Sequence, residues 1–458
     1  MRKIIVAVTL LLGTLFAQGQ INIVRYNDKF SYLKNDTIPK KSFEKIKYIH
    51  LYKTINISFG GELREQFQYY NNQNFGDVPP SFKQASTVHL WHRAMAHTNI
   101  ELGIKFRIFA QFGSTFRFIN HNPLTPEIDE NKLSLHQAFI DYSFQKKWLV
   151  RLGRQEISYG NHRLITFREG PNTRLAFDAA IFKYHSEKRR IDIFAFTPVT
   201  SMQGIFDDKS FEDLIFGIYA TDNIVPNKIL LDYYFLNFNS NKRRYYYAAG
   251  EENRQSYGVR IFSQKPTLNY ELEATYQSGR FNQLNISAYG ISADVNYKFV
   301  SRHNFIIGLG SNYMSGDKNK NDHQLNTYNS IFSKPPFGLI APIGLSNIVN
   351  INPYFKIDPT QKWNVYAGVY QMWRQSNQDG TYSPGAGGAL ETRPIPRLLS
   401  TSTKKQIGTL LVMESSYFVN SHLSFGFDAS YFFKGQYVKE TGKGKNITYC
   451  SFKGSYKF

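Results

Sequence analysis

The last thirteen residues of the chain, 446–458, constrain its fold more than any other segment. Cys450, Phe452, Gly454, Tyr456 and Phe458 fall on one parity, and Ser451, Lys453, Ser455 and Lys457 fall on the other. Successive side chains of a β-strand point to opposite faces, so the segment predicts a strand with one apolar and one polar face. The fold must therefore offer this strand an apolar surrounding on one side and water on the other.

The start of the chain has the pattern of a secretory leader. A basic start at 1–3, an apolar run at 4–16 and small residues at 17–19 predict a signal peptide over 1–19, cleaved near Gly19. The apolar run is shorter than the roughly 20 residues that cross a bilayer as a helix, and no other segment comes close. A location in a membrane would therefore require a closed barrel, because only helices and closed sheets satisfy every backbone group in lipid. The aromatic last residue, Phe458, resembles the C-terminal signal of bacterial outer-membrane barrels.

The composition agrees with a barrel. Aromatic residues make up 16% of the chain, yet its mean hydropathy is negative, as expected for a wet lumen and an aromatic-girdled exterior. The single cysteine, Cys450, excludes an intramolecular disulfide. The formal charge of +20 falls to +18 without Arg2 and Lys3, and suggests an acidic partner: nucleic acid, lipopolysaccharide phosphates or an anionic solute. The leader argues against nucleic acid.

Eighteen segments of about ten residues alternate with period two. They are 55–68, 88–101, 104–118, 135–144, 147–158, 175–184, 189–197, 213–221, 228–238, 254–263, 268–278, 286–299, 303–314, 346–357, 362–374, 405–417, 421–433 and 446–458. The clearest is 286–299, where Ile291 and Val295 alternate with Ser292 and Asp294. An even number of strands lets both ends of the chain lie on the periplasmic side.

The links between these segments are alternately short and long, as in outer-membrane barrels with short periplasmic turns and long outer loops. The longest links, about 315–345 and 375–404, are long enough to be functional. The sequence thus predicts an all-β fold, a transmembrane antiparallel barrel of about eighteen strands over 55–458. A basic segment, 20–54, precedes the barrel and is expected in the periplasm.

The main candidates for function are arginines whose position in the two-residue alternation places them on the lumen side of their segment. They are Arg64, Arg93, Arg107, Arg151, Arg174, Arg260 and Arg374, and the acids Glu62, Asp141, Asp178, Glu271, Glu273, Asp294 and Glu414 share their face. One interpretation is a ladder of ion pairs that holds the barrel in shape. The other is a conduit, because guanidinium groups stay charged and offer paired donors to a passing carboxylate.

The densest cluster of such residues lies in 153–178. A β-bulge at Gly153 is expected to turn Arg154 and Glu156 inward, although Leu152 faces lipid. This segment, with its Gly153-Arg154-Gln155, Tyr159-Gly160, Arg163-Leu164, Asn172, Arg174 and Asp178, resembles the signature of the alginate export family of outer-membrane proteins. Further likeness lies in 60–64, 106–111 and 428–438, so the resemblance covers most of the mature chain.

The resemblance implies an eighteen-stranded barrel with an arginine-rich conduit that passes a polyuronate outward. It carries this role to Arg64, Arg107, Arg154, Arg163, Arg174 and Asp178. Together with the arginines of the lumen parity, the expected conduit comprises Arg64, Arg93, Arg107, Arg151, Arg154, Arg163, Arg168, Arg174, Asn172, Asp178, Arg260 and Arg374. The chain departs from the family at 407–413, where apolar Leu410 and Val412 fall on the lumen side.

Other chemistry is sparse. His92 faces opposite to His89 and His97, so no shared metal site is expected. Glu271 and Glu273 share a face as a glycosidase pair would, but two carboxylates that face a water-filled lumen do not by themselves indicate catalysis. We therefore expect a channel in the outer membrane of a Gram-negative bacterium, without catalytic residues, metal or cofactor. The expected partners are an anionic polysaccharide or other anionic solute, outer-membrane lipid, lipopolysaccharide and periplasmic secretion proteins, but not nucleic acid. A general anion or nutrient porin, and an outer-membrane enzyme or adhesin, are the alternatives.

Overall fold

The computed structural model of the protein describes residues 21–34, 43–52, 54–77, 86–118, 129–226, 228–299, 303–340, 342–383 and 402–458. The predicted signal peptide, 1–19, lies outside these residues, as does most of the predicted loop 375–404.

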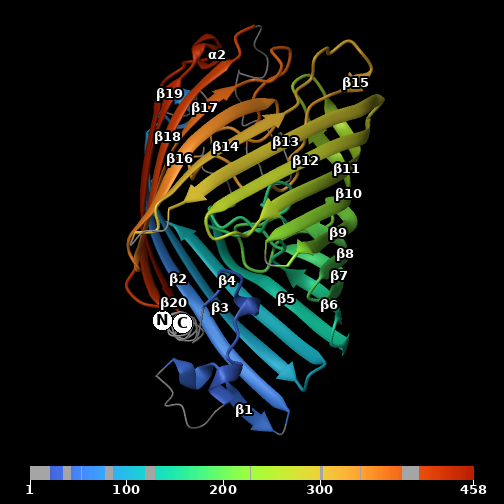
Figure 1. Cartoon of the computed structure of the whole chain (residues 1–458), viewed down its shortest axis with the longest axis vertical. Helices are drawn as coiled ribbons and strands as arrows, with labels where there is room; N and C mark the ends of the chain where they lie inside the picture. Colours follow the sequence, from blue (N-terminus) through green and yellow to red (C-terminus); the bar gives the residue numbers. More distant parts are fainter. Residues whose placement is uncertain are drawn as a thin grey trace, which may run out of the picture.

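Eighteen antiparallel strands form a closed barrel (Figure 1). They are β2 (Ile55–Asn71), β3 (Thr87–Leu102), β4 (Phe106–Arg117), β5 (Asn131–Gln145), β6 (Trp148–Gln155), β7 (Phe177–His185), β8 (Arg189–Pro198), β9 (Asp213–Val225), β10 (Ile229–Arg244), β11 (Ala249–Ser263), β12 (Leu268–Phe281), β13 (Leu284–Lys298), β14 (Ile306–Met314), β16 (Ile348–Thr360), β17 (Trp363–Trp373), β18 (Gln406–Phe418), β19 (Leu423–Lys434) and β20 (Ile447–Lys457). Each pairs with its neighbour in the chain, and β2 pairs with β20, from Glu62 with Lys457 to Asn71 with Thr448. This last pairing closes the barrel and confirms the predicted fold.

The remaining elements are short. β1 (Ile49–Tyr52) pairs with β2, and β15 (Gln324–Leu325) runs parallel to β13. The helices are η1 (Arg25–Asn27), η2 (Ser31–Lys34), η3 (Glu44–Ile46), η4 (Gln73–Gly76) and α2 (Gln436–Glu440). Among the described residues, no helix has the length and apolar character that a membrane span requires.

The side chains of the strands alternate as the sequence predicts. On β13, Ile291 and Val295 are 52% and 45% exposed, whereas Ser292 is buried. On β20, Phe452 is 51% exposed and Ser451 is buried. The outward side chains are thus apolar and meet lipid, while the inward ones are polar or pack against segments inside the barrel.

Within the described residues, short connections alternate with longer ones, as the sequence predicts. Examples of the short ones are the links from β5 to β6 and from β16 to β17, each of two residues between the strand bounds. They join strands at the same end of the barrel at which β2 begins and β20 ends, so this end faces the periplasm. The longer loops lie at the opposite, outer end.

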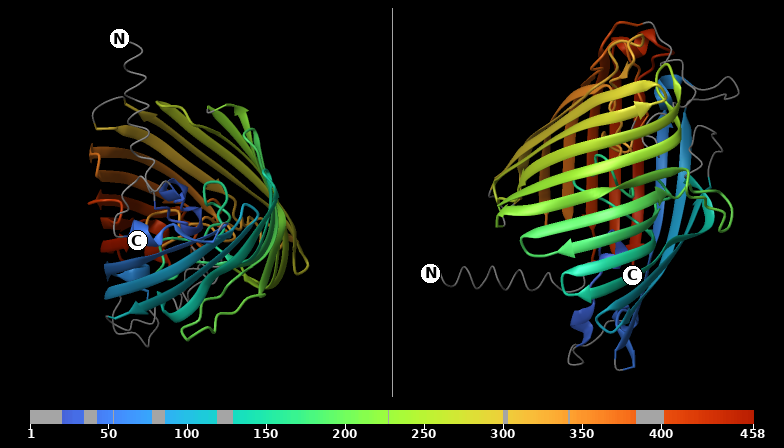
Figure 2. Two further views of the ribbon diagram at one scale, coloured as in Figure 1. Left: turned by 90° about the horizontal axis from the view of Figure 1, so that it is seen from below. Right: turned by 90° about the vertical axis from the view of Figure 1, so that its right-hand side faces the viewer.

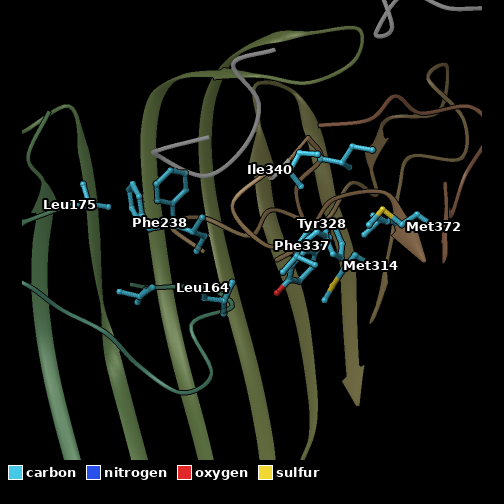
Figure 3. Packing of buried hydrophobic residues seen from close by; sticks show 14 of the residues in the cluster. Leu164, Leu175, Phe238, Met314, Tyr328, Phe337, Ile340 and Met372 are labelled. Carbon is cyan, nitrogen blue, oxygen red and sulfur yellow. The ribbon is translucent and has the colours of Figure 1, made fainter. Parts of the chain in front are cut away.

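Two long loops fold back into the barrel, the one between β6 and β7 and the one between β14 and β16. They bind each other through backbone hydrogen bonds, from Phe332 N to Leu164 O (2.8 Å) and from Thr166 N to Phe332 O (3.1 Å). Figure 3 shows Leu164 of the first loop and Phe337 of the second within one buried apolar cluster. The lumen is therefore not an open bore over its whole height, because an apolar cluster fills part of it.

Leu410 and Val412 belong to this apolar cluster and are buried. They do face inward, as predicted, but Phe337 and Ile340 of the loop between β14 and β16 share the cluster with them. The apolar departure from the family pattern is thus explained by the loop that packs inside the barrel, and not by the wall of a solute path.

Candidate functional site

The periplasmic half of the lumen holds a dense set of charged side chains, which we call the entrance cluster. It comprises eight basic side chains, Arg25, Lys47, Arg64, Arg93, Arg107, Arg151, Arg174 and Lys457, and five carboxylates, Asp28, Glu62, Asp141, Glu156 and Glu169. The strands β2 to β6, the base of the loop between β6 and β7, and the residues before β1 supply most of it. The cluster carries an excess of positive charge.

Arg93 and Arg174 form the centre of the entrance cluster. Arg93 Nη2 donates to Glu62 Oε1 at 2.6 Å and to Glu169 Oε1 at 2.5 Å. Arg174 binds Glu62 (3.3 Å), Glu156 (3.4 Å) and Glu169. Burial alone would lower the pKa of the Arg174 guanidinium, but the carboxylates of Glu169, Glu62 and Glu156 raise it above its usual value. Arg174 therefore stays charged and ties the loop to the wall.

The side chain of Arg64 binds the same loop, mainly at the backbone carbonyl oxygens of the loop. Its guanidinium donates to Glu169 O (3.1 Å), to Pro171 O (3.2 Å) and to Asn172 Oδ1 (3.3 Å). Asn172 Nδ2 in turn donates to Asp129 O at 2.9 Å and to His92 O at 3.2 Å. Asn172 thus fixes the loop to the wall.

Arg107 and Arg151 lie on neighbouring parts of the wall and meet at Asp141. Arg151 donates to both carboxylate oxygens of Asp141, at 2.6 and 2.8 Å, whereas Arg107 Nη1 lies 3.7 Å from Asp141. Tyr26 lies against both arginines: its ring centroid is 4.3 Å from the Arg151 guanidinium carbon, and its carbonyl oxygen accepts from Arg107 Nη2 at 2.5 Å. The segment before the barrel therefore reaches into the periplasmic mouth.

Arg25 fastens that segment to the closing strands of the barrel. It is buried, and it donates to Gly61 O at 2.6 Å and to Phe458 O at 2.8 Å. Lys47 Nζ donates to Phe59 O at 2.7 Å, and burial, with Arg25 nearby, lowers the pKa of Lys47 to about 8. Seen from below, this segment lies within the ring of strands (Figure 2).

A second group of charges lies where the tip of the loop between β6 and β7 meets β12. Arg163 Nη1 donates to Glu271 Oε1 (2.5 Å) and Glu273 Oε2 (2.9 Å), and Arg260 donates to Glu271 Oε2 (2.8 Å) and Asp232 Oδ2 (2.6 Å). Glu271 and Glu273 share the inner face, as predicted, and both bind Arg163. These ion pairs support the loop from a distant part of the wall.

Arg154 and Asp178 belong neither to the entrance cluster nor to the second group of charges, and they pair with each other. Strand pairing runs through Gly153 on both sides without a register shift, so the predicted bulge is wrong. Gly153 instead keeps its place in the ladder with a φ of +123°, which a residue without Cβ adopts easily. Arg154 consequently shares the parity of the exposed Leu152, and it pairs with Asp178 at 2.8 Å. Glu156 does face inward, as predicted.

Arg168 and Arg374 hold loops. Arg168 Nε donates to Ser333 O at 2.9 Å, which joins the two inward loops, and burial lowers the pKa of Arg168 to about 10. Arg374 donates to Asp379 O (2.8 Å) and Ser402 O (2.8 Å) at the outer end, and its guanidinium carbon lies 3.9 Å from the ring centroid of Tyr437 in α2.

Two aromatic features of the site were not expected. One is Tyr26, which contacts both Arg107 and Arg151. The other is a stack of Tyr159, Tyr219 and Tyr234, whose ring centroids are 4.9 and 5.4 Å apart. Their hydroxyls donate to Asp192 (3.1 Å), Asp232 (2.6 Å) and Glu273 (2.9 Å). The inward parity of Tyr219 and Tyr234 on their strands is the signal that could have found this stack.

The histidines are arranged as predicted. His89 and His97 are buried on the inner face, and His92 points outward and contacts Glu65. Within the described ranges, no group of three or more histidine, cysteine, aspartate or glutamate side chains is placed to hold a metal ion.

A closed eighteen-stranded barrel with a charged lumen, inward loops and short periplasmic turns defines an outer-membrane channel. The alginate export family model matches residues 55–449, and the chain belongs to this family. Family and fold are thus those of a channel and not of an enzyme. A search of curated protein sequences finds no match.

Solved structures with similar folds support the same architecture. Pseudomonas aeruginosa OpdO superimposes with a TM-score of 0.59 at 10% identity, over 88% of this chain and 97% of that one. OccK8 (OprE) of the same organism superimposes with a TM-score of 0.59 at 11% identity, over 88% of this chain and 98% of that one. Acinetobacter baumannii OccAB1 superimposes with a TM-score of 0.58 at 10% identity, over 88% of this chain and 96% of that one. At these identities the likeness concerns the fold alone.

Proposed function

We propose that the channel passes an anionic, alginate-like oligosaccharide or polysaccharide. One observation carries this proposal: Arg64 Nε, Arg151 Nη1 and Arg260 Nε are buried and, among the described residues, have no hydrogen-bond acceptor. All three belong to strands of the barrel and lie on its inner face. A buried guanidinium donor without an acceptor can still bind a water molecule, or the oxygen of a carboxylate that reaches it.

The ion pairs of the lumen are compatible with this role. Most inward arginines already bind carboxylates, so each could offer a solute only part of its donors. Many weak sites of this kind suit conduction, because a solute must enter favourably and still leave. Arg107 is the best placed of them, since its side chain is 23% exposed and lies 3.7 Å from Asp141 rather than in a short ion pair. Membership of the alginate export family supports a polyuronate as the solute.

The excess of basic groups in the entrance cluster supports selectivity for anions. Outward transport is what the family resemblance implies, and contact with lipopolysaccharide is a prediction from the positive charge of the chain. Periplasmic secretion partners stay a prediction.

The test is the reversal potential of the purified protein in a planar bilayer under a KCl gradient. We expect a potential of the sign that chloride selectivity gives, largest at low ionic strength, because salt screens charges over about 10 Å at 0.1 M. Cation selectivity at low salt would contradict the proposal. Anion selectivity without any effect of polyuronate on the current would favour the alternative, a general anion porin.

A further inference from the structure

The residues before the barrel occupy the mouth through which a periplasmic solute would enter. We propose that residues 21–34 are a tethered plug of the periplasmic mouth, and that an anionic polymer displaces it by taking its place on Arg107, Arg151 and Arg174. The inference rests on the proposed function, because these arginines belong to the predicted conduit.

The plug is seated by two adjacent side chains. Arg25 reaches the closing seam of the barrel, where it binds backbone oxygens of β2 and of the last residue. Tyr26 points the other way, and its ring meets Phe139 and Phe109 edge-on, at centroid distances of 5.2 and 6.0 Å. The Tyr26 hydroxyl donates to Glu156 O at 2.8 Å, at the base of the loop between β6 and β7. The segment thus bridges opposite sides of the entrance cluster.

The plug uses the donors that a polymer would use. Arg107 donates to the carbonyl oxygen of Tyr26 at 2.5 Å, and Arg174 donates to that of Ile23 at 3.3 Å. The face of the Arg151 guanidinium is covered by the Tyr26 ring. A carboxylate in place of a neutral carbonyl oxygen makes a charge-assisted hydrogen bond, which is roughly twice as strong. Polyuronate therefore competes on favourable terms for Arg107 and Arg174, and it reaches the face of Arg151 once the Tyr26 ring has left.

The attachment of the plug can be reversed. Residues 21–34 form two short 3-10 helices, and none of them pairs as a strand with the barrel. Displacement therefore breaks a few hydrogen bonds and ring contacts and leaves the sheet intact. Segments with few backbone hydrogen bonds to their surroundings open at lower free energy than core strands.

A reversible lock tests the plug. In a Cys450→Ser background, a short bifunctional methanethiosulfonate joins Tyr26→Cys to Phe139→Cys and so holds the plug against the wall, because the two native rings lie 5.2 Å apart between centroids. A reductant cleaves the link. The control is Phe43→Cys with Tyr456→Cys, because these rings also lie close, at 5.9 Å between centroids, but outside residues 21–34. Both pairs are assayed in planar bilayers before and after reduction, with a polyuronate and with a neutral dextran of similar length.

We expect cross-linking of the first pair to lower the conductance severalfold and to abolish the interaction with polyuronate, and reduction of the link to restore both. The control pair should show no such change. Equal conductance and equal polyuronate block in the linked and the reduced first pair would overturn the plug.

A second variant removes the seat without any cross-link. Arg25→Ala with Tyr26→Ala should raise the basal conductance and lower the concentration of polyuronate needed for half-maximal block. An unchanged conductance would again overturn the plug. If instead the lock changes the conductance as expected while no state responds to polyuronate, the mouth is gated but the proposed solute is wrong. The two failures are thus distinguishable.

Discussion

Arg163 Nη1 lies 2.5 Å from Glu271 Oε1, and this contact joins the loop between β6 and β7 to β12 across 108 residues of sequence. Both side chains are largely buried, at 14% and 16% exposure. The ion pair supports the tip of the loop inside the barrel, and Arg260 binds the second oxygen of the same carboxylate.

Arg163→Gln should release this loop without opening the barrel. The variant removes the charge-assisted hydrogen bonds to Glu271 and Glu273, and since Arg260 and Tyr234 still bind these carboxylates, we expect a loss of about 1–3 kcal/mol in stability. The measurement is the temperature at which the folded band disappears on heat-modifiable gels, together with the noise of the single-channel current. Lys334→Gln, a change to an exposed side chain of the partner loop, is the control and should alter neither. A variant with the same transition temperature and the same current noise as the wild type would show that the ion pair does not hold the loop in place.

Arg107→Gln with Arg151→Gln should reduce anion selectivity. Both arginines belong to the entrance cluster and contact the plug, so their loss removes positive charge where a solute enters. Reversal potentials at low ionic strength measure the change. The control is Arg189→Gln, because Arg189 is 52% exposed and pairs with Asp222 at the periplasmic turn outside the lumen. Unchanged selectivity in the folded double variant would remove both arginines from the conduit.

Single cysteines on β13 test which face is wet. In a Cys450→Ser background, Asn296→Cys should react with a membrane-impermeant thiol reagent, since Asn296 shares the inner face with Asp294 and donates to it at 3.0 Å. Val295→Cys should stay unlabelled in lipid because Val295 faces outward. Equal labelling of both positions would contradict the register of the barrel.

The outer loop after β14 should be held more firmly at acid pH. Burial raises the pKa of Asp317 to about 6, and burial also raises that of Asp379, whose Oδ2 accepts from Asp317 N at 2.9 Å. The native loop therefore binds a proton as the pH falls through about 6, before the detached loop does, so its attachment strengthens toward acid pH.

A nitroxide at Lys320→Cys, in the Cys450→Ser background, should accordingly be less mobile at about pH 5 than at about pH 8. Asp317→Asn should flatten this dependence. A label at Lys362→Cys in a periplasmic turn, far from these carboxylates, serves as the control. Mobility that rises on acidification would contradict the assignment.

Local patterns in the sequence predict the wall of the barrel well. The alternation at Ile291, Ser292 and Val295 and at Ser451 and Phe452 depends only on the two-residue period of a strand, and the structure has it. The short turns follow from the same pattern. The inward orientation of the arginines on the strands follows as well, because the two-residue period alone decides which face of a strand a side chain takes.

The interior of the lumen could not be predicted in this way. Phe332 N binds Leu164 O, and the two residues are 168 positions apart, so no local pattern reports the contact. Tyr26 finds its place only when β4, β5 and β6 come together. At Gly153 the prediction was wrong because glycine can continue a strand at positive φ as readily as it can form a bulge.

The most direct test of the account is the block of single-channel current by polyuronate. Added on the periplasmic side of the wild-type protein, polyuronate should interrupt the current in discrete events that become rarer as the salt concentration rises, because the contacts are electrostatic. Neutral dextran of the same length should not interrupt it. Equal block by both polymers, or no block by polyuronate at low salt, would contradict the claim that the barrel is a channel for anionic polysaccharide.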